Sequence, residues 1–289
     1  TIALSALANF TTFDLSSGTD TSNVNFSGTL DISALTVPTI MNTETGNLLG
    51  SAGNNDILTL TGTQLNGLMV GAGTINLGAG TGDTLNLKST STSLNTLGAT
   101  DGSVAGVEAV SLAAAAAGVT LSLSGQTEAF TITGSAFADT MTGGSGGDTF
   151  NIASGDFDAG ESITGGGGTD ILLLTTSGTT IDFSIGTLTT LETLTATAGN
   201  DTVTMAASQW ASFTTINLVS GTDVLNVTAS GNISASGTPT VSNVDTGNLT
   251  GTSGSDSITL SGTQLNAILI GTGTVNLGGG AADTINLTS

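Results

Sequence analysis

One glycine-rich pattern sets narrow limits on the fold of this 289-residue chain. The nonapeptide G-G-x-G-x-D-x-U-x, in which U is a large apolar residue, matches residues 143–151 and matches residues 165–173 again. A degenerate copy at residues 134–142 precedes the first match in the same register. Each unit joins a six-residue turn that ends in Asp to a short strand with one inward apolar side chain. Because such units stack as coils, the pattern predicts a repetitive β-structure.

The same turns offer oxygen atoms to a metal ion. Glycine brings backbone carbonyls close together, and Ca²⁺ takes six to eight oxygen ligands from carboxylates and carbonyls. The predicted Ca²⁺ ligands are three carboxylates and the carbonyls of six turn glycines, namely Asp139, Asp148, Asp170, Gly143, Gly144, Gly146, Gly165, Gly166 and Gly168. Asp156, Asp158 and Glu161 lie between the matches and are candidates to complete the coordination sphere. The alternative is that these Asp and Gly residues only form solvated turns.

Other Asp residues occupy a similar position, after a glycine-containing turn and before a strand. Asp83 and Asp283 are added to the candidate metal ligands on this ground. Five more share the position: Asp20, Asp56, Asp201, Asp223 and Asp256. Because the turns before these residues contain fewer glycines, the ligand interpretation and the turn interpretation both stay open for all seven.

The charge balance restricts the partners of the chain. Its net charge is −21, from 22 acidic residues and a single basic one, Lys88. Nucleic-acid binding needs Lys and Arg to displace counterions, and anionic lipid surfaces attract basic segments, so we expect neither partner. No apolar run is long enough for a transmembrane helix, and we expect no membrane insertion. The natural partner of so many carboxylates is a divalent cation.

Catalysis has little support in the composition. The chain has no His and no Cys, and therefore lacks the side chain that most often transfers protons near neutral pH. A pair of carboxylates can do acid–base work, but the basic and aromatic residues that usually surround such a pair are nearly absent. We therefore expect that the protein is not an enzyme.

The chain also repeats on a longer scale. Residues 10–15 recur as 213–218, residues 45–48 as 246–249, and residues 62–66 as 262–266, at offsets of 200 to 203 residues. This indicates one unit of about 200 residues. Residues 1–100 are then the end of one copy, residues 101–200 hold central coils with the nonapeptide segment 134–173, and residues 201–289 begin the next copy, equivalent to 1–89. Neither Thr1 to Leu4 nor Ile285 to Leu287 reads as a cap, so we expect both ends to continue into neighbouring copies.

Short strands punctuate this unit. Segments of the form apolar–Asn–apolar recur, for example at residues 24–26, 75–77, 85–87 and 225–227. Their period of two places the aliphatic side chains on one face and Asn on the other, where stacked Asn residues would form amide ladders. Only residues 63–68 and 207–213 suggest one or two helical turns, and residues 113–117 favour a narrow coil interior over a helix. The predicted fold is all-β, a parallel β-solenoid (β-helix) with short lateral excursions.

The nonapeptides resemble the calcium-binding repeats of the repeats-in-toxin (RTX) family of secreted bacterial proteins. The resemblance covers residues 134–173 and implies RTX-like calcium-binding coils, secretion by a type I pathway, and ordering by extracellular Ca²⁺ at the bacterial cell surface. It suggests a structural repeat of a surface fibre, sheath or S-layer that assembles end to end with neighbouring copies of itself. The alternative is a passive stalk or spacer of a giant adhesin. A carbohydrate-active β-helix enzyme is a third class, against which the composition argues.

Overall fold

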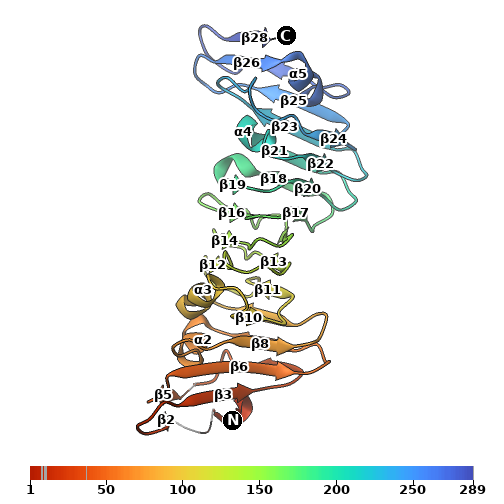
Figure 1. The fold of residues 1–289 in the computed structure, drawn as a ribbon. Coiled ribbons are helices and arrows are strands. Elements are labelled where there is room, and N and C mark those ends of the chain that lie inside the picture. The colour runs from red at the N-terminus through yellow and green to blue at the C-terminus, as the bar shows by residue number, and fades with distance from the viewer. Residues whose placement is uncertain (8, 10–11, 37, 289) are drawn as a thin grey trace. The chain divides into compact units, whose positions relative to one another are not determined.

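The computed structural model describes residues 1–7, 9, 12–36 and 38–288, and it shows a parallel β-solenoid (Figure 1). Short strands of successive coils lie side by side, and their pairing is parallel throughout the named pairs. The predicted fold class is therefore confirmed. Residues 10 and 11, the first two of the predicted repeat 10–15, lie outside the described residues.

The chain divides into two compact units. The first contains Thr1–Thr149 with Gly166–Gly168, and the second contains Phe150–Gly165 with Thr169–Ser289. The division falls inside the nonapeptide segment, so it separates groups of coils and does not follow the 200-residue sequence repeat. Within the described ranges, no helix has the length and apolar character needed to cross a membrane.

The first unit builds its coils from two longer rows of strands and two shorter pairs. One row runs in the order β1 (Ile2–Ala3), β3 (Thr21–Asn25), β6 (Thr45–Ser51), β8 (Ile75–Gly78), β10 (Val104–Ala105). A second row contains β4 (Thr29–Asp31), β7 (Ile57–Leu60), β9 (Thr84–Leu87), β11 (Ala109–Ser111) and β13 (Thr131–Thr133). Two further pairs are β2 (Thr12–Asp14) with β5 (Thr39–Met41), and β12 (Thr120–Ser122) with β14 (Thr140–Thr142). The helices are α1 (Leu4–Leu7), α2 (Gly62–Leu68) and α3 (Thr92–Gly98).

The second unit repeats this plan. One row contains β18 (Thr180–Asp182), β21 (Thr202–Ala206), β23 (Val224–Thr228), β25 (Thr246–Thr250) and β27 (Val275–Asn276). Another contains β15 (Thr149–Ile152, from Phe150 on in this unit), β17 (Ile171–Leu174), β20 (Thr193–Thr195), β22 (Thr215–Asn217) and β24 (Thr240–Ser242). Two more pairs are β16 (Ser162–Thr164) with β19 (Thr187–Thr189), and β26 (Ser257–Ser261) with β28 (Thr284–Thr288). The helical pieces are η1 (Phe183–Ile185), α4 (Ala207–Trp210) and α5 (Gly262–Ile268).

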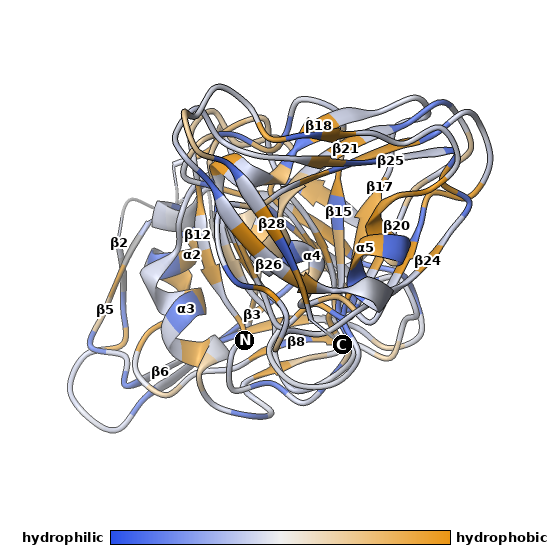
Figure 2. Ribbon diagram, turned by 90° about the horizontal axis from the view of Figure 1, so that it is seen from above, coloured by the Kyte–Doolittle hydropathy of each residue, from blue (hydrophilic) through white to orange (hydrophobic). Residues whose placement is uncertain are grey.

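The register stacks apolar residues on apolar residues. Val24 pairs with Leu48, which pairs with Ile75, and all three side chains are buried. Along a strand the buried positions alternate with partly exposed ones, as the period of two predicts. Figure 2 shows the same alternation as apolar bands between polar ones along β26 and β28. Because each coil packs only against its neighbours, the polar groups of each turn must be bound close by.

The predicted amide ladders form, but only over short stretches. Asn47 donates its side-chain amide to Asn23 at 2.8 Å, and Asn248 donates to Asn226 at 2.9 Å. The pattern at residues 24–26 pointed to Asn25 instead. Asn25 faces Leu49 across the strand pair, because the stacking register and not the local pattern decides which Asn residues meet.

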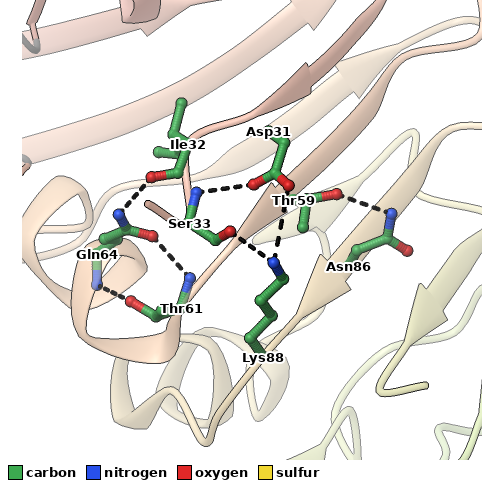
Figure 3. Close-up of polar contacts among 8 residues, drawn as sticks. All are labelled: Asp31, Ile32, Ser33, Thr59, Thr61, Gln64, Asn86 and Lys88. Carbon is green, nitrogen blue, oxygen red and sulfur yellow. Dashed lines mark hydrogen bonds and ion pairs between the residues drawn. The ribbon is translucent and has the colours of Figure 1, made fainter. Parts of the chain in front are cut away.

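The lateral excursions are held by buried glutamines. Gln64 of α2 accepts the Thr61 N–H and donates to the carbonyls of Ile32 and Leu35, as Figure 3 shows in part. Gln209 of α4 and Gln264 of α5 make the equivalent three bonds. The two predicted helical turns are thus confirmed, whereas α1, α3, α5 and η1 were not predicted. Residues 113–117 form a turn in which only Ala115 is buried, so the predicted coil-lining role is wrong for the other four.

Candidate metal centre

The nonapeptide aspartates close their own turns. Asp148 lies at the end of the first nonapeptide turn, its side chain is buried, and its carboxylate oxygens accept the Gly144 N–H at 2.7 Å and the Phe130 N–H at 2.8 Å. Asp139 does the same with Ser135 and Val119, both at 2.7 Å. One bond stays within the turn and the other reaches the preceding coil. Each aspartate therefore fixes both the shape of its turn and the stacking of two coils.

The glycines of the motif explain its spacing. A Cβ atom on Gly166 or Gly168 would meet the carbonyl of Gly144 or Gly146 in the turn before it, at less than a contact distance. Both glycines also have φ above +100°, a region that other residues rarely adopt. At the variable position between them, a Cβ on Gly167 would lie 3.6 Å from its nearest neighbour, an ordinary contact. Stacked turns thus pack carbonyl against glycine, as the pattern predicted.

The remaining predicted ligands lie in different surroundings. Asp170 is buried, and its backbone N–H donates to Glu192 at 2.8 Å. Glu161 is also buried, whereas Asp158 is exposed and Asp156 accepts the Ala153 N–H within its own turn. Within the described residues, no three acidic side chains converge on one point. An ion at these turns would therefore take no more than two carboxylates, and backbone carbonyls and water would supply its other ligands.

Burial changes the acidity of two of these carboxyls. Desolvation raises the pKa of Asp148 above its ordinary value of 3.8, against the opposing effect of the N–H groups of Phe130 and Gly144. Desolvation also raises the pKa of Asp201, and the negative charge of Asp223 raises it further. For both groups the folded structure disfavours the charged form. A cation close to either carboxylate would reverse this cost.

The same aspartate position recurs outside the nonapeptides. In the first unit the Asp83 carboxylate accepts the backbone N–H of Asp56 at 2.6 Å. In the second unit Asp223 accepts the N–H of Asp201 at 2.8 Å, and Asp283 accepts that of Asp256 at 2.9 Å. These are columns of stacked aspartates, one per coil, that run along the side of the solenoid. The sequence left open whether these Asp residues only form turns or also bind metal. The structure shows that their carboxylates bind backbone N–H groups, which supports the structural role.

Four acidic residues outside the predicted set join these columns. Each lies one coil after an Asp, accepts the backbone N–H of that Asp, and donates its own N–H to the carbonyl of the same Asp. The pairs are Asp20 with Glu44, Asp83 with Glu108, Asp170 with Glu192, and Asp223 with Asp245. We call them acidic clamps. The sequence marks the acidic clamps only by an acidic residue just before a strand, as at Glu108 and Glu192. This pattern does not show which Asp the residue binds.

The one basic side chain is used elsewhere. Lys88 donates to the Ser33 hydroxyl at 2.6 Å and lies 3.7 Å from the Asp31 carboxylate, at the surface (Figure 3). In the second copy of the repeat, Asn232 takes the place of Asp31 and Thr288 that of Lys88. The charge pair is therefore present in one copy and replaced on both sides in the other. At least nine described acidic side chains are buried, and a single lysine cannot neutralise them: Asp56, Asp83, Asp139, Asp148, Glu161, Asp170, Asp201, Asp223 and Asp256.

Compared with models of protein families, with curated protein sequences and with solved structures, the chain shows no significant match. Its architecture and its turns are therefore the basis for the functional argument.

Proposed function

We propose that this chain is a structural repeat segment of a secreted, calcium-stabilised bacterial surface fibre, sheath or S-layer, which assembles end to end with neighbouring copies. The observation that carries the proposal is the repetition of one set of solenoid coils. β3, β6 and α2 in the first unit have counterparts in β23, β25 and α5 in the second, with the same pairing and the same glutamine bonds. Solenoids of this kind gain length by adding coils, since each coil contacts only its neighbours.

Calcium is proposed as the stabilising ion at the nonapeptide turns. Buried charges in proteins are generally paired or bound to metal, and the chain has one lysine for at least nine buried carboxylates. The carboxylates of Asp139, Asp148 and Asp170 and the carbonyls of the turn glycines are oxygen donors of the kind that Ca²⁺ prefers. The RTX-like form of the turns supports the same ion, and with it an extracellular location.

Calcium titration and electron microscopy together test the proposal. Isothermal titration should show uptake of Ca²⁺ by the intact chain, and chelation should lower its melting temperature, because an ion that binds only the folded state stabilises it by mass action. Negative-stain images of the native protein should then show ordered filaments or lattices when Ca²⁺ is present. No Ca²⁺ uptake would remove the calcium part of the proposal. Isolated thin stalks that each end in a globule would instead favour an adhesin spacer.

A further inference from the structure

We propose that the acidic clamps are a second class of divalent-cation site, separate from the nonapeptide turns. The proposal extends the calcium dependence argued above but rests on other residues. Its strongest cases are Asp83 with Glu108 in the first unit and Asp223 with Asp245 in the second. In both, an Asp with a buried carboxylate oxygen that lacks a hydrogen-bond partner among the described residues donates its backbone N–H to a second carboxylate, which is at least partly exposed.

The Asp83–Glu108 clamp shows the geometry. Glu108 accepts the Asp83 N–H at 2.7 Å, and the Asp83 carbonyl accepts the N–H groups of Glu108 and Ala109, both at 3.0 Å. These bonds hold the Glu108 carboxylate against the backbone of Asp83. The Asp83 side chain is fully buried, and its Oδ1 accepts the Asp56 N–H. Its Oδ2 is also buried, and within the described part of the chain it has no hydrogen-bond partner.

The Asp223–Asp245 clamp repeats this arrangement in the second unit. Asp245 accepts the Asp223 N–H at 2.9 Å and returns its own N–H to the Asp223 carbonyl at 3.0 Å. Asp223 Oδ1 accepts the N–H of Asp201, while Oδ2 is buried and lacks a partner among the described residues. The Asp20–Glu44 clamp, which occupies the equivalent place in the first copy of the repeat, also has a buried Oδ2 of this kind.

A recurrent buried oxygen without a donor indicates a ligand. A buried carboxylate oxygen that accepts no hydrogen bond has lost its hydration without replacement. In these clamps a second carboxylate is bound to the backbone N–H of the same Asp, and its negative charge raises the cost of leaving the oxygen bare. A hard divalent cation that bridges the buried oxygen and the outer carboxylate would remove both costs. Because Glu108 is half-buried and Asp245 exposed, an ion can enter from solvent and keep water ligands, as Ca²⁺ does in weak extracellular sites.

The test counts bound ions in variants that keep the clamp hydrogen bond. In Glu108→Gln and Asp245→Asn, the amide oxygen can still accept the aspartate N–H, while the outer negative charge is lost. Titration of the full chain with Ca²⁺ alone, with native mass spectrometry for stoichiometry, should show one fewer ion for each variant and two fewer for the double variant. Asp182→Asn is the matched control, because Asp182 is exposed and, among the described residues, its carboxylate binds only Ser184. Its ion count should equal that of the parent protein.

Separate outcomes distinguish the two calcium proposals. Asp148→Asn alters a nonapeptide turn and no acidic clamp, so it reports on the nonapeptide site alone. If Glu108→Gln and Asp245→Asn bind as many ions as the parent protein, with the same affinity, the clamps hold no cation and the inference is overturned. If those two lose ions and Asp148→Asn does not, the clamp inference stands and the nonapeptide proposal fails. Circular dichroism checks that each variant folds, and the two clamps provide independent cases if one variant does not.

Discussion

At the scale of single residues, the carboxylate of a buried Asp is first of all an acceptor for backbone N–H groups. A coil that turns every few residues leaves N–H groups in its corners that no strand partner reaches. Asp148 binds one such group in its own turn and one in the coil before it. Asp has the side-chain length for this task, because its carboxylate folds back over its own turn. The metal binding proposed above would then be a second use of a side chain that the fold already requires.

Removal of the Asp148 carboxylate should therefore be costly in itself. Asp148→Ala leaves the N–H groups of Phe130 and Gly144 without this acceptor, and we expect the free energy of unfolding to fall by about 2–4 kcal/mol even without metal. Asp182→Ala removes an exposed cap of the short helix η1 and should cost about 1 kcal/mol or less. Chemical denaturation in chelator measures both, and Ca²⁺ titration should show weaker binding for Asp148→Ala and for Asp170→Ala than for Asp182→Ala. Equal effects at all three positions would contradict the nonapeptide interpretation.

The raised pKa values of Asp148 and Asp201 predict how stability depends on pH. A carboxyl whose pKa is higher in the folded state than in the unfolded state binds a proton more readily when folded. Its stabilising contribution is thus full below 3.8, the ordinary value, and is lost as pH rises through the folded pKa. Metal-free protein should melt at a higher temperature when the pH falls from neutrality towards 3.8. The exposed Asp14 and Asp31 have lowered pKa values, so they stabilise the folded state at neutral pH and lose this contribution as the pH falls. That loss occurs mainly below pH 3.8.

Melting curves over this pH range in metal-free buffer provide the measurement. Asp201→Asn should melt higher than the parent protein at neutral pH and show a weaker dependence on pH, since its amide carries no charge next to Asp223. Saturating Ca²⁺ should reverse the trend, because protons then compete with the ion. A melting temperature that falls steadily with pH in the metal-free protein would contradict the argument.

At the scale of elements, the nonapeptide turn shows why its sequence is so restricted. A Cβ on Gly165 would collide with the Thr190 carbonyl and with the Asp170 carboxylate, whereas a Cβ on Gly167 meets only ordinary contacts. We expect Gly165→Ala to lower the melting temperature clearly and Gly167→Ala to change it little. The two variants make the same chemical change two residues apart, so they are matched controls for each other. Thermal unfolding with and without Ca²⁺ measures the difference in melting temperature. An equal decrease for both variants would show that close packing does not explain the glycine positions of the nonapeptide.

Much of this could be predicted from sequence, and two of the failures share one physical cause. Local patterns gave the strands, the Asp-terminated turns and the two helical turns at Gln64 and Gln209, because spacing within a few residues decides those features. They did not give the acidic clamps or the correct Asn ladder, since both depend on which residues meet across a coil. Coil lengths vary, for example with an offset of 20 residues at Leu121–Met141 and of 29 at Ile75–Val104. Because coil lengths are irregular, no fixed sequence period predicts which residues pair between coils.

At the scale of the whole molecule, the net charge of −21 sets the conditions under which copies of the chain can meet. The single lysine cannot balance this charge, and the buried Asp side chains keep part of it inside the coils. Like charges on two copies oppose their approach until bound cations lower the repulsion. The end-to-end assembly proposed above should therefore depend on Ca²⁺.

We predict that the chain associates with itself more strongly when Ca²⁺ is present. Association brings together molecules that each carry a charge of −21, so bound cations should favour it by lowering their repulsion. Sedimentation velocity over a range of concentrations should show a shift towards larger species with Ca²⁺, and chelation should reverse that shift. A monovalent salt at the same ionic strength is the control, and it should produce a smaller shift because it only screens the charges. A well-folded protein that stays strictly monomeric at high concentration with Ca²⁺ would contradict end-to-end assembly.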